Sequence, residues 1–350
     1  MSRAPRDDAP AAARVAITSE VSAPRGEDVA ARTPAGAVAP SVLATPELSL
    51  IVVHWRAEDD LAALLAAVPH DARFEVVVVD NGGTAALPVT ERVRVVRPRA
   101  NLGFAGGANL GAAIAAAPLL LVANPDVRPE PGALEALLAG FTAQPEAAGL
   151  APRLISVGGA PQTAWQLRAL PRPAQLLQHA LFYDAGRGAA VEPAAGARVE
   201  QPAAAALALR RSAWERLGGF DPTFHPAWFE DVDLARRLAD AGGAIAYWPA
   251  AAFRHGLGGS VAPLGYGAFL WHYHRNLGRY LRKHHGAGWA AAARALLVVS
   301  SALLALALPL RRPRRAKSRG DALAGLTAVA FGALSGWRLP RRLARAESGA

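Results

Sequence analysis

Residues 48–83, LSLIVVHWRAEDDLAALLAAVPHDARFEVVVVDNGG, decide the fold class of this chain. The apolar run at 48–55 predicts a buried strand, and residues 59–68 predict a helix after it. Residues 74–83 predict a second buried strand, which ends in an acid, an amide and two glycines. Strands that alternate with helices indicate an α/β fold with a parallel or mostly parallel sheet covered by helices. Two more strands are expected at 93–98 and 118–127.

Polar residues follow two of these expected strands. Asp80 and Asn81 end the second strand, and Asn124 and Asp126 end the strand at 118–127. In open α/β sheets ligands bind at the carboxyl ends of the strands, so these four residues are candidate ligand contacts. Each pair taken alone is explained equally well by turn chemistry, since Asp and Asn end strands in many proteins.

The segment between these two pairs, NLGFAGGANLGAAIAAA at 101–117, has glycines at the start of an Ala-rich helix. Glycines there let backbone amides come close to a phosphate or a sugar, and a helix N-terminus favours an anion. Tight helix packing explains the same small residues. The spacing is not G-x-G-x-x-G, and no such loop follows the first strand, which disfavours a dinucleotide-binding oxidoreductase.

Three carboxylates, Glu230, Asp231 and Asp233, stand at the start of an expected amphipathic helix. Acids in a first helical turn interact favourably with the helix dipole, so capping is one explanation for them. Three acids after the aromatic pair at 228–229 exceed what capping requires. One of them is therefore a candidate base in a partly desolvated pocket, where its pKa can be tuned.

Any metal in this protein must be held by oxygen or imidazole ligands, because the chain contains no cysteine. His255 follows the strand-like run AIAYWPAAAFRH and is surrounded by glycines. A single histidine is more often structural than a ligand. Here the glycines leave room for a polyphosphate and a metal beside the imidazole.

Positive charge is concentrated at the C-terminal end of the chain. Residues 286–350 carry 11 Arg and Lys and 2 acids, which is +9 of the net +10. Apolar segments at 295–310 and 322–334 with cationic flanks predict helices at an anionic membrane surface. The alternative is a soluble helical pair packed on the preceding domain. Nucleic acid is disfavoured as a partner because interleaved aromatics and known motifs are both missing.

Several segments, in this order, resemble glycosyltransferase family 2, particularly its bacterial rhamnosyltransferase-like members. They are VVVVDNGG, NLGFAGGANLG, LLLVANPDV, LRRSAWERLGGFDPTF, FEDVDLARRL and the H-x-x-G-x-S of 255–260. The resemblance covers 48 to about 260 and implies a GT-A fold, a sheet sandwiched by helices, over 47–285. Residues 1–46 are rich in Ala, Pro and charge and show no apolar period, which predicts a disordered leader. The apolar runs and positive charge of 286–350 predict a helical tail that associates with a membrane.

The resemblance also implies the chemistry, which is inverting transfer of a sugar from a nucleotide diphosphate. Asp231 is the implied base, with Glu230 as the alternative. Asp126 and His255 are the implied ligands of Mg²⁺ or Mn²⁺, which would stabilise the diphosphate as it leaves. The implied donor-binding residues are Asp80, Asn81, Asn101, Gly103, Gly107, Asn109 and Asn124.

The implied partners are a nucleotide-sugar donor, dTDP-rhamnose, and a polyprenyl-diphosphate-linked saccharide acceptor at the cytoplasmic face of the cell membrane. Two departures from the family pattern bear on these sites: His54 and Trp55 end the first strand, and 201–211 lacks the usual glycine. A processive synthase is disfavoured because Q-x-x-R-W is missing. A nucleotidyltransferase and an inactive binding module remain as alternatives, although retention of Asp126, Asp231 and His255 argues against the latter.

Overall fold

The computed structural model describes residues 45–82, 87, 93–183, 191–256, 264–310, 313 and 316–337, and the structural statements below concern these residues. Residues from Leu43 to Ala350 belong to one compact unit. All but the last two residues of the expected leader, and the end of the H-x-x-G-x-S motif, lie outside the described residues.

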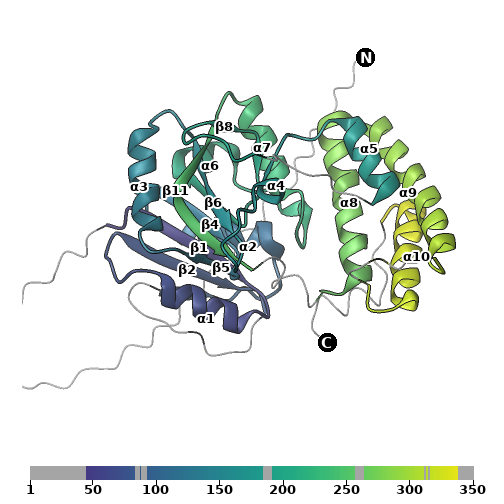
Figure 1. The fold of residues 1–350 in the computed structure, drawn as a ribbon, viewed down its shortest axis with the longest axis horizontal. Helices are drawn as coiled ribbons and strands as arrows, with labels where there is room; N and C mark the ends of the chain where they lie inside the picture. Colours follow the sequence, from purple (N-terminus) through teal and green to yellow (C-terminus); the bar gives the residue numbers. More distant parts are fainter. Residues whose placement is uncertain are drawn as a thin grey trace, which may run out of the picture. The chain divides into compact units, whose positions relative to one another are not determined.

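A mixed sheet forms the centre of the fold (Figure 1), and nine strands belong to it within the described residues. Parallel pairing joins β3, β2, β1 and β4 in that order, and β10 then runs antiparallel between β4 and β6. β11 is parallel to β6 and antiparallel to β5 and β8. The strands are β1 Leu48–His54, β2 Phe74–Asp80, β3 Val93–Val96, β4 Leu119–Ala123, β5 Val127–Pro129, β6 Gly149–Ile155, β8 Arg198–Val199, β10 Ala206–Arg210 and β11 Ile245–His255.

The α/β prediction is confirmed, with shorter strands than the sequence suggested. β2 ends at Asp80 instead of residue 83. The strand expected at 118–127 ends at Ala123, because residues 124–126 form a turn in which the Val127 amide donates to the Asn124 carbonyl (3.2 Å). The polar residues of that segment therefore lie in a turn at the end of β4.

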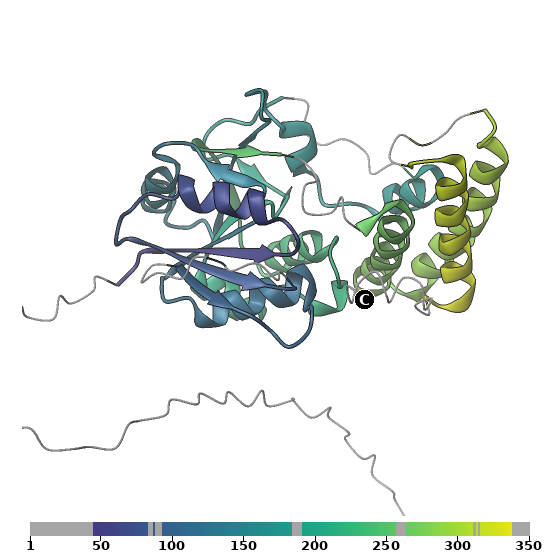
Figure 2. The same ribbon diagram turned by 90° about the horizontal axis from the view of Figure 1, so that it is seen from below.

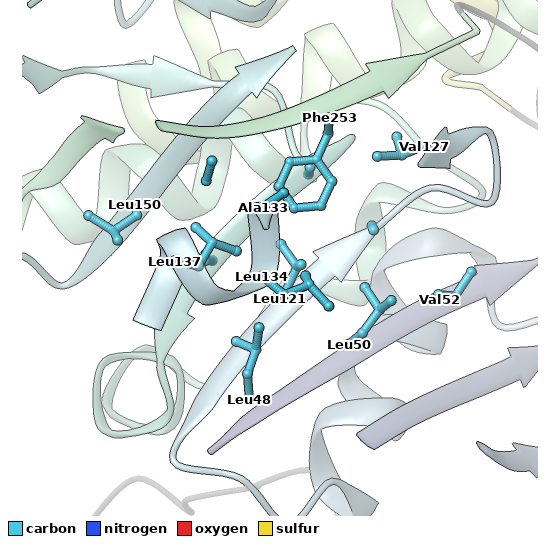
Figure 3. Packing of buried hydrophobic residues seen from close by; sticks show 14 of the residues in the cluster. Leu48, Leu50, Val52, Leu121, Val127, Ala133, Leu134, Leu137, Leu150 and Phe253 are labelled. Atoms are coloured by element: carbon cyan, nitrogen blue, oxygen red, sulfur yellow. The ribbon is translucent and has the colours of Figure 1, made fainter. Parts of the chain in front are cut away.

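The two faces of the sheet are covered by different helices. Leu48, Leu50 and Val52 of β1 belong to one core cluster with α1 Glu58–Ala67 and α3 Ala133–Ala143 (Figure 3). Ile51 and Val53 point the other way and belong to a cluster with α2 Gly103–Ile114, α6 Arg211–Leu217 and α7 Glu230–Asp240. This alternation is what the two-residue period of a strand requires. A small second sheet pairs β7 Leu167–Arg168 with β9 Gln201–Pro202.

Four further helices form a separate helical core, which we call the helical unit (Figures 1 and 2). They are α5 Pro173–Phe182, α8 Tyr266–His285, α9 Ala287–Ala307 and α10 Arg319–Ser335. Its buried side chains include Leu176 of α5, Leu277 of α8, Leu297 of α9 and Leu326 of α10. Gly286 lies between α8 and α9, and both α9 and α10 pack on α8. The domain boundary expected after residue 285 stays a prediction.

Two short helices complete the chain near the sheet. They are α4 Thr163–Gln166 and the 3₁₀ helix η1 Pro222–Phe224, which precedes the segment leading into α7.

Candidate active site

A cavity of about 230 Å³ lies where β1, β2 and β4 end. It brings together eight of the eleven site residues expected from the sequence. Those eight are Asn81, Asn101, Gly103, Asn124, Asp126, Glu230, Asp231 and His255. They come from five separate parts of the chain, so the fold alone makes them neighbours.

Asp126 and His255 face each other across the end of the sheet. Antiparallel pairing of β5 with β11 sets His255 opposite Val127, which places the imidazole beside Asp126. The Asp126 Oδ2 lies 3.7 Å from the His255 Nε2, and both side chains are 2% exposed. Burial lowers the pKa of His255, while the negative charge of Asp126 opposes that shift.

Gln162 fixes which nitrogen of His255 carries the proton. The Gln162 Nε2 donates to the His255 carbonyl (3.0 Å), so its Oε1 must accept from the His255 Nδ1 (2.8 Å). In the neutral imidazole the lone pair is then on Nε2, directed toward Asp126.

These two side chains suit a divalent cation. A carboxylate oxygen and an unprotonated imidazole nitrogen are both electron-pair donors, and at a separation of 3.7 Å both could bind one ion. No group of three or more His, Asp or Glu side chains that could hold a metal occurs in the part of the chain that the structure describes. The other ligands would therefore be substrate oxygens and water, as is common for Mg²⁺ at phosphate-binding sites.

Glu230 and Asp231 begin α7 and both line the cavity. Burial raises the pKa of Glu230, and the negative charge of Asp231 raises it further. Within the described residues, the Glu230 Oε2 is buried without a hydrogen-bond partner. Protonation of Glu230 removes the cost of a buried, unpaired charge.

Asp231 is in a different environment from Glu230. Burial raises the pKa of Asp231 as well, but the Val232 amide (2.8 Å), the Ala204 amide (3.3 Å) and the charge of Arg168 oppose the shift. Of this coupled pair, Asp231 is therefore the carboxyl that loses its proton first.

Asp233 has a structural role. It is fully buried and accepts hydrogen bonds from the Arg237 Nε (2.8 Å), the Lys283 Nζ (2.7 Å) and the His284 Nε2 (2.8 Å). Burial alone would raise the pKa of Asp233, but these partners outweigh it and lower the pKa to about 2. A lowered pKa adds stability above the ordinary value of the group, and that stability is lost as the pH falls toward 2. Asp233 thus ties α7 to α8.

Asp80 does not line the cavity. Its side chain is fully buried and accepts hydrogen bonds from the His54 Nδ1 (3.1 Å) and the Arg97 Nε (3.0 Å). The Ala57 amide donates to the His54 Nε2 (3.2 Å), which fixes the imidazole. Asp80 thus anchors the ends of β1 and β2, and its contact with the donor stays a prediction.

Asn109 and Gly107 are also support residues in the structure, and they do not line the cavity. The Asn109 side chain donates to the Phe220 carbonyl (2.7 Å) and accepts from the Phe220 amide (2.9 Å). A Cβ on Gly107 would lie 2.7 Å from the Val53 Cγ1, so this glycine lets α2 pack closely on β1. Both residues therefore stabilise the fold beside the cavity, and their contact with the donor stays a prediction.

Asn81 and Gly103 shape the wall of the cavity on the α2 side. The Asn81 Nδ2 donates to the Gly103 carbonyl (2.9 Å), and the Leu102 amide donates to the Asn81 Oδ1 (3.1 Å). Gly103 has a φ of +68°, and a Cβ there would lie 2.7 Å from the Pro226 carbonyl oxygen. This position requires glycine for its conformation and for the close approach.

Some cavity residues were missed by the reasoning from sequence. Trp55, Trp165 and Trp228 contribute aromatic walls, and the Trp165 ring lies 4.9 Å from the His255 ring between centroids. Trp55 could have been found, since it directly follows β1 at the edge where ligands bind. Gln162 and Arg168 had no local signal, because their roles depend on partners 93 and 63 residues away in the chain.

Comparisons with known proteins identify the family of this chain. The family model described as glycosyltransferase like family 2 matches residues 46–283. An N-acetylglucosaminyl-diphospho-decaprenol L-rhamnosyltransferase of Mycobacterium tuberculosis is 31% identical over 307 residues, 78% of this chain and 97% of that protein. A pre-mycofactocin glycosyltransferase of the same species is 32% identical over 213 residues, 55% of this chain and 42% of that protein.

Among solved structures, a mannosyltransferase from Pyrobaculum calidifontis in complex with GDP-Man and Mn²⁺ is similar, with a TM-score of 0.46 and 18% identity. The similarity covers 86% of this chain and 91% of that one. The family match over residues 46–283, together with the relative aligned over nearly its whole length, shows that the chain belongs to glycosyltransferase family 2 and is a glycosyltransferase.

Proposed function

We propose that this glycosyltransferase is metal-dependent and inverting, and that it moves L-rhamnose from dTDP-rhamnose to a hydroxyl of a polyprenyl-diphosphate-linked saccharide. The observation that carries the reaction type is the cavity itself, in which a carboxylate and an imidazole suited to a cation share one space with a second, separately tuned carboxylate. The sugar and the acceptor are supported by the rhamnosyltransferase of Mycobacterium tuberculosis, whose name specifies an N-acetylglucosaminyl-diphospho-decaprenol acceptor.

In the proposed mechanism, Asp231 takes the proton of the acceptor hydroxyl as that oxygen attacks the anomeric carbon. The nucleoside diphosphate leaves from the opposite face, so one displacement inverts the configuration. Asp126 and His255 would hold a divalent cation, Mg²⁺ or Mn²⁺, which when bound neutralises charge on the leaving diphosphate. Asn81, Asn101, Gly103 and Asn124 would line the donor. Trp165 and Trp228 exclude water from the reacting groups.

A panel of nucleotide sugars tests the donor. The full-length protein would be heated with each candidate and Mn²⁺, because a ligand that binds only the folded state raises the melting temperature by mass action. dTDP-rhamnose should give the largest increase, and EDTA should remove it. A larger, metal-independent shift with another nucleotide sugar would contradict both the donor and the metal.

Gln162 provides a test of the metal site that leaves both ligands in place. Gln162→Leu removes the acceptor of the His255 Nδ1 proton, so the imidazole loses its fixed orientation. Changes at such supporting residues typically cost ~10- to 100-fold in metal affinity. Titration of Mn²⁺ followed by its electron paramagnetic resonance signal should show that loss. Gln166→Leu is the matched control, since Gln166 is also buried but its side chain bonds Pro152 and Leu154 instead.

The alternative of an inactive sugar-nucleotide-binding module predicts binding without turnover. Donor hydrolysis or transfer above background, dependent on added metal, would exclude it. A nucleotidyltransferase would release diphosphate from a nucleoside triphosphate, which the same assay can measure.

We also propose that the helical unit places the enzyme on the surface of an anionic membrane, on its cytoplasmic face. α9 is long and apolar enough to cross a membrane, judged by length and composition, and no second such helix is found in the described ranges. One side of α9 packs inside the protein: Leu297 lies in the helical core, and Ser300 donates to the Ala180 carbonyl of α5 (2.8 Å). The opposite side exposes Val299, Leu303 and Leu306, a helical stripe of apolar side chains.

This one-sided exposure favours a helix that lies at the interface over one that spans the bilayer, since a spanning helix would lose its bonds to α5. Leu310 after α9 and Phe331 and Leu334 of α10 are exposed as well. The arginines that the sequence concentrates in 286–350 would contact anionic head groups.

Charge placed on the exposed stripe should prevent membrane binding. Leu303→Glu with Leu306→Glu, at side chains that are 57% and 77% exposed, should abolish flotation with phosphatidylglycerol vesicles while the melting temperature stays close to that of the wild type. The control is Val157→Glu with Val191→Glu, at residues 70% and 80% exposed outside the helical unit. Equal flotation of both double variants and the wild type would contradict this surface.

A further inference from the structure

Residues 225–229 directly precede α7, the helix that carries the proposed base Asp231, and part of this segment lines the cavity. Pro226, Ala227 and Trp228 line the cavity, and Glu230 starts α7 immediately afterwards. Trp228 and Phe229 both have a φ of +74°. Left-handed conformations are disfavoured for residues with side chains, so the surroundings must hold this segment in place.

Asn276 of α8 supplies that support from the helical unit. Its side chain is fully buried, and the Nδ2 donates to the carbonyls of Ala227 (2.8 Å) and Trp228 (3.2 Å). A third, longer contact reaches the His225 carbonyl (3.4 Å). An Asn side chain here satisfies backbone carbonyls that an apolar side chain would leave without a donor.

Arg275 assists from the neighbouring position of α8. Its Nη2 donates to the His225 carbonyl, and its Nε donates to the Asn276 Oδ1 (3.3 Å). The Arg275 guanidinium also lies over the Trp271 ring, 4.8 Å from the centroid. These contacts orient the Asn276 amide so that both of its hydrogens face residues 225–229.

The same segment is joined on its other side to the start of α2 and to the residue Asn101 before it. The Phe104 amide donates to the Pro226 carbonyl (2.6 Å), and the His225 Nε2 lies 3.2 Å from the Asn101 carbonyl. Phe229 is buried in the core of the helical unit. Residues 225–229 are therefore fixed between α8 and the start of α2, and Asp231 follows two residues later.

We propose that Asn276 is a positioning residue for sugar transfer: by holding the backbone of residues 225–229, it sets the direction of Asp231 toward the acceptor hydroxyl. The helical unit is on this account part of the catalytic structure as well as the membrane-facing part. The inference rests on the proposed role of Asp231 as the base.

Kinetics of the full-length Asn276→Asp and Asn276→Ala variants test this role. Transfer would be measured with a short, soluble acceptor, so that membrane binding does not enter. The account predicts kcat ~10- to 100-fold below that of the wild type, because a displacement of about 1 Å at a reacting group can cost that much. The donor affinity, measured by calorimetry with Mn²⁺, should stay within ~3-fold, because Asn81, Asp126 and His255 are held by the sheet.

Ser300→Ala is the matched control. Ser300 is also buried in the helical unit, but within the described residues its side chain donates to the Ala180 and Leu297 carbonyls and to none of residues 225–229. It should lower the melting temperature with little change in kcat. If the Asn276 variants lose stability to the same degree and keep full kcat, Asn276 is only structural and the proposal is wrong.

Two further variants keep the outcome clear. If both Asn276 variants fail to fold, Arg275→Gln, at a partly exposed site, should still lower kcat several-fold, and unchanged kcat would overturn the proposal. Asp231→Asn is measured in parallel. An active Asp231→Asn enzyme means that the proposed base is wrong, whereas an inactive one beside fully active Asn276 variants rejects the positioning role alone.

Discussion

Asp231→Asn should lower the rate of sugar transfer by ~10²- to 10⁴-fold, the usual cost of removing a general base. The substitution keeps the size of the side chain and one acceptor oxygen, which can still accept from the Val232 amide. Only the longer contact with the Ala204 amide (3.3 Å) is lost, so the fold should be unchanged. Donor binding should stay close to that of the wild type, because the base acts on the acceptor. Steady-state transfer and donor calorimetry on the same preparation separate the two effects.

Glu230→Gln should be measured beside Asp231→Asn, because the comparison shows which of the two carboxyls is the base. Because burial and the charge of Asp231 raise the pKa of Glu230, the account treats this residue as protonated, and a neutral amide should replace it with most activity retained. Asp240→Asn, at an exposed acid on the same helix, controls for charge. If Asp231→Asn is active and Glu230→Gln is inactive, the two roles are reversed.

The pH dependence of transfer should follow from the same environment. Burial raises the pKa of Asp231 above its ordinary value of 3.8. Since the deprotonated form is the active one, kcat/KM should rise with pH and reach its plateau at a higher pH than an exposed aspartate would give.

Asp126→Ala should have the second large effect, a loss of metal-dependent donor binding by at least ~10²-fold. The change removes the negative ligand of the proposed site, and the donor diphosphate alone holds a hard cation poorly. A loss larger than the ~10- to 100-fold expected for Gln162→Leu would indicate that Asp126 binds the metal directly and that Gln162 only orients a ligand.

Calorimetry with donor in the presence of Mn²⁺ and again in EDTA measures the effect of Asp126→Ala. Glu130→Ala is the control, since Glu130 is a nearby acid that pairs with Arg254 at the surface. Equal donor affinity in wild type and Asp126→Ala would refute the metal assignment, and an equal loss in Glu130→Ala would point to general electrostatics.

The sequence predicted the features of the fold that depend on local patterns. The apolar runs of β1, β2 and β4 and their polar endings are local, so the sheet was predicted correctly. The resemblance to a family then named Asp126, Asp231 and His255, and the structure brings these three residues to one cavity.

Other features depend on contacts that a single sequence does not show. Asn109 bonds Phe220, 111 residues away, and Asp80 is enclosed by His54 and Arg97, so neither reaches the cavity. Gln162 meets His255 only because the loop after β6 passes beside the end of β11. Strand-end polar residues look alike in sequence whether they point to a ligand or to a buried partner.

The C-terminal segment illustrates the same limit. Apolar runs such as 295–310 look alike whether they face lipid or protein. The bonds from Ser300 to the Ala180 carbonyl and between the Tyr183 and Ser301 hydroxyls (2.6 Å) show that one side of α9 is packed against α5. α9 and α10 also pack on α8. Removing 286–350 would therefore uncover the apolar side of α8, the helix that carries Asn276.

The central claim, metal-dependent and inverting transfer to a lipid-linked acceptor, is tested most directly by one assay. The full-length protein is incubated with labelled dTDP-rhamnose, Mn²⁺ and polyprenyl-diphosphate-linked N-acetylglucosamine, and the anomeric configuration of the lipid product is read by nuclear magnetic resonance. The account predicts a rhamnosylated lipid of inverted configuration, which disappears with EDTA and with Asp231→Asn. A product of retained configuration, or transfer that is unchanged in EDTA, would contradict it.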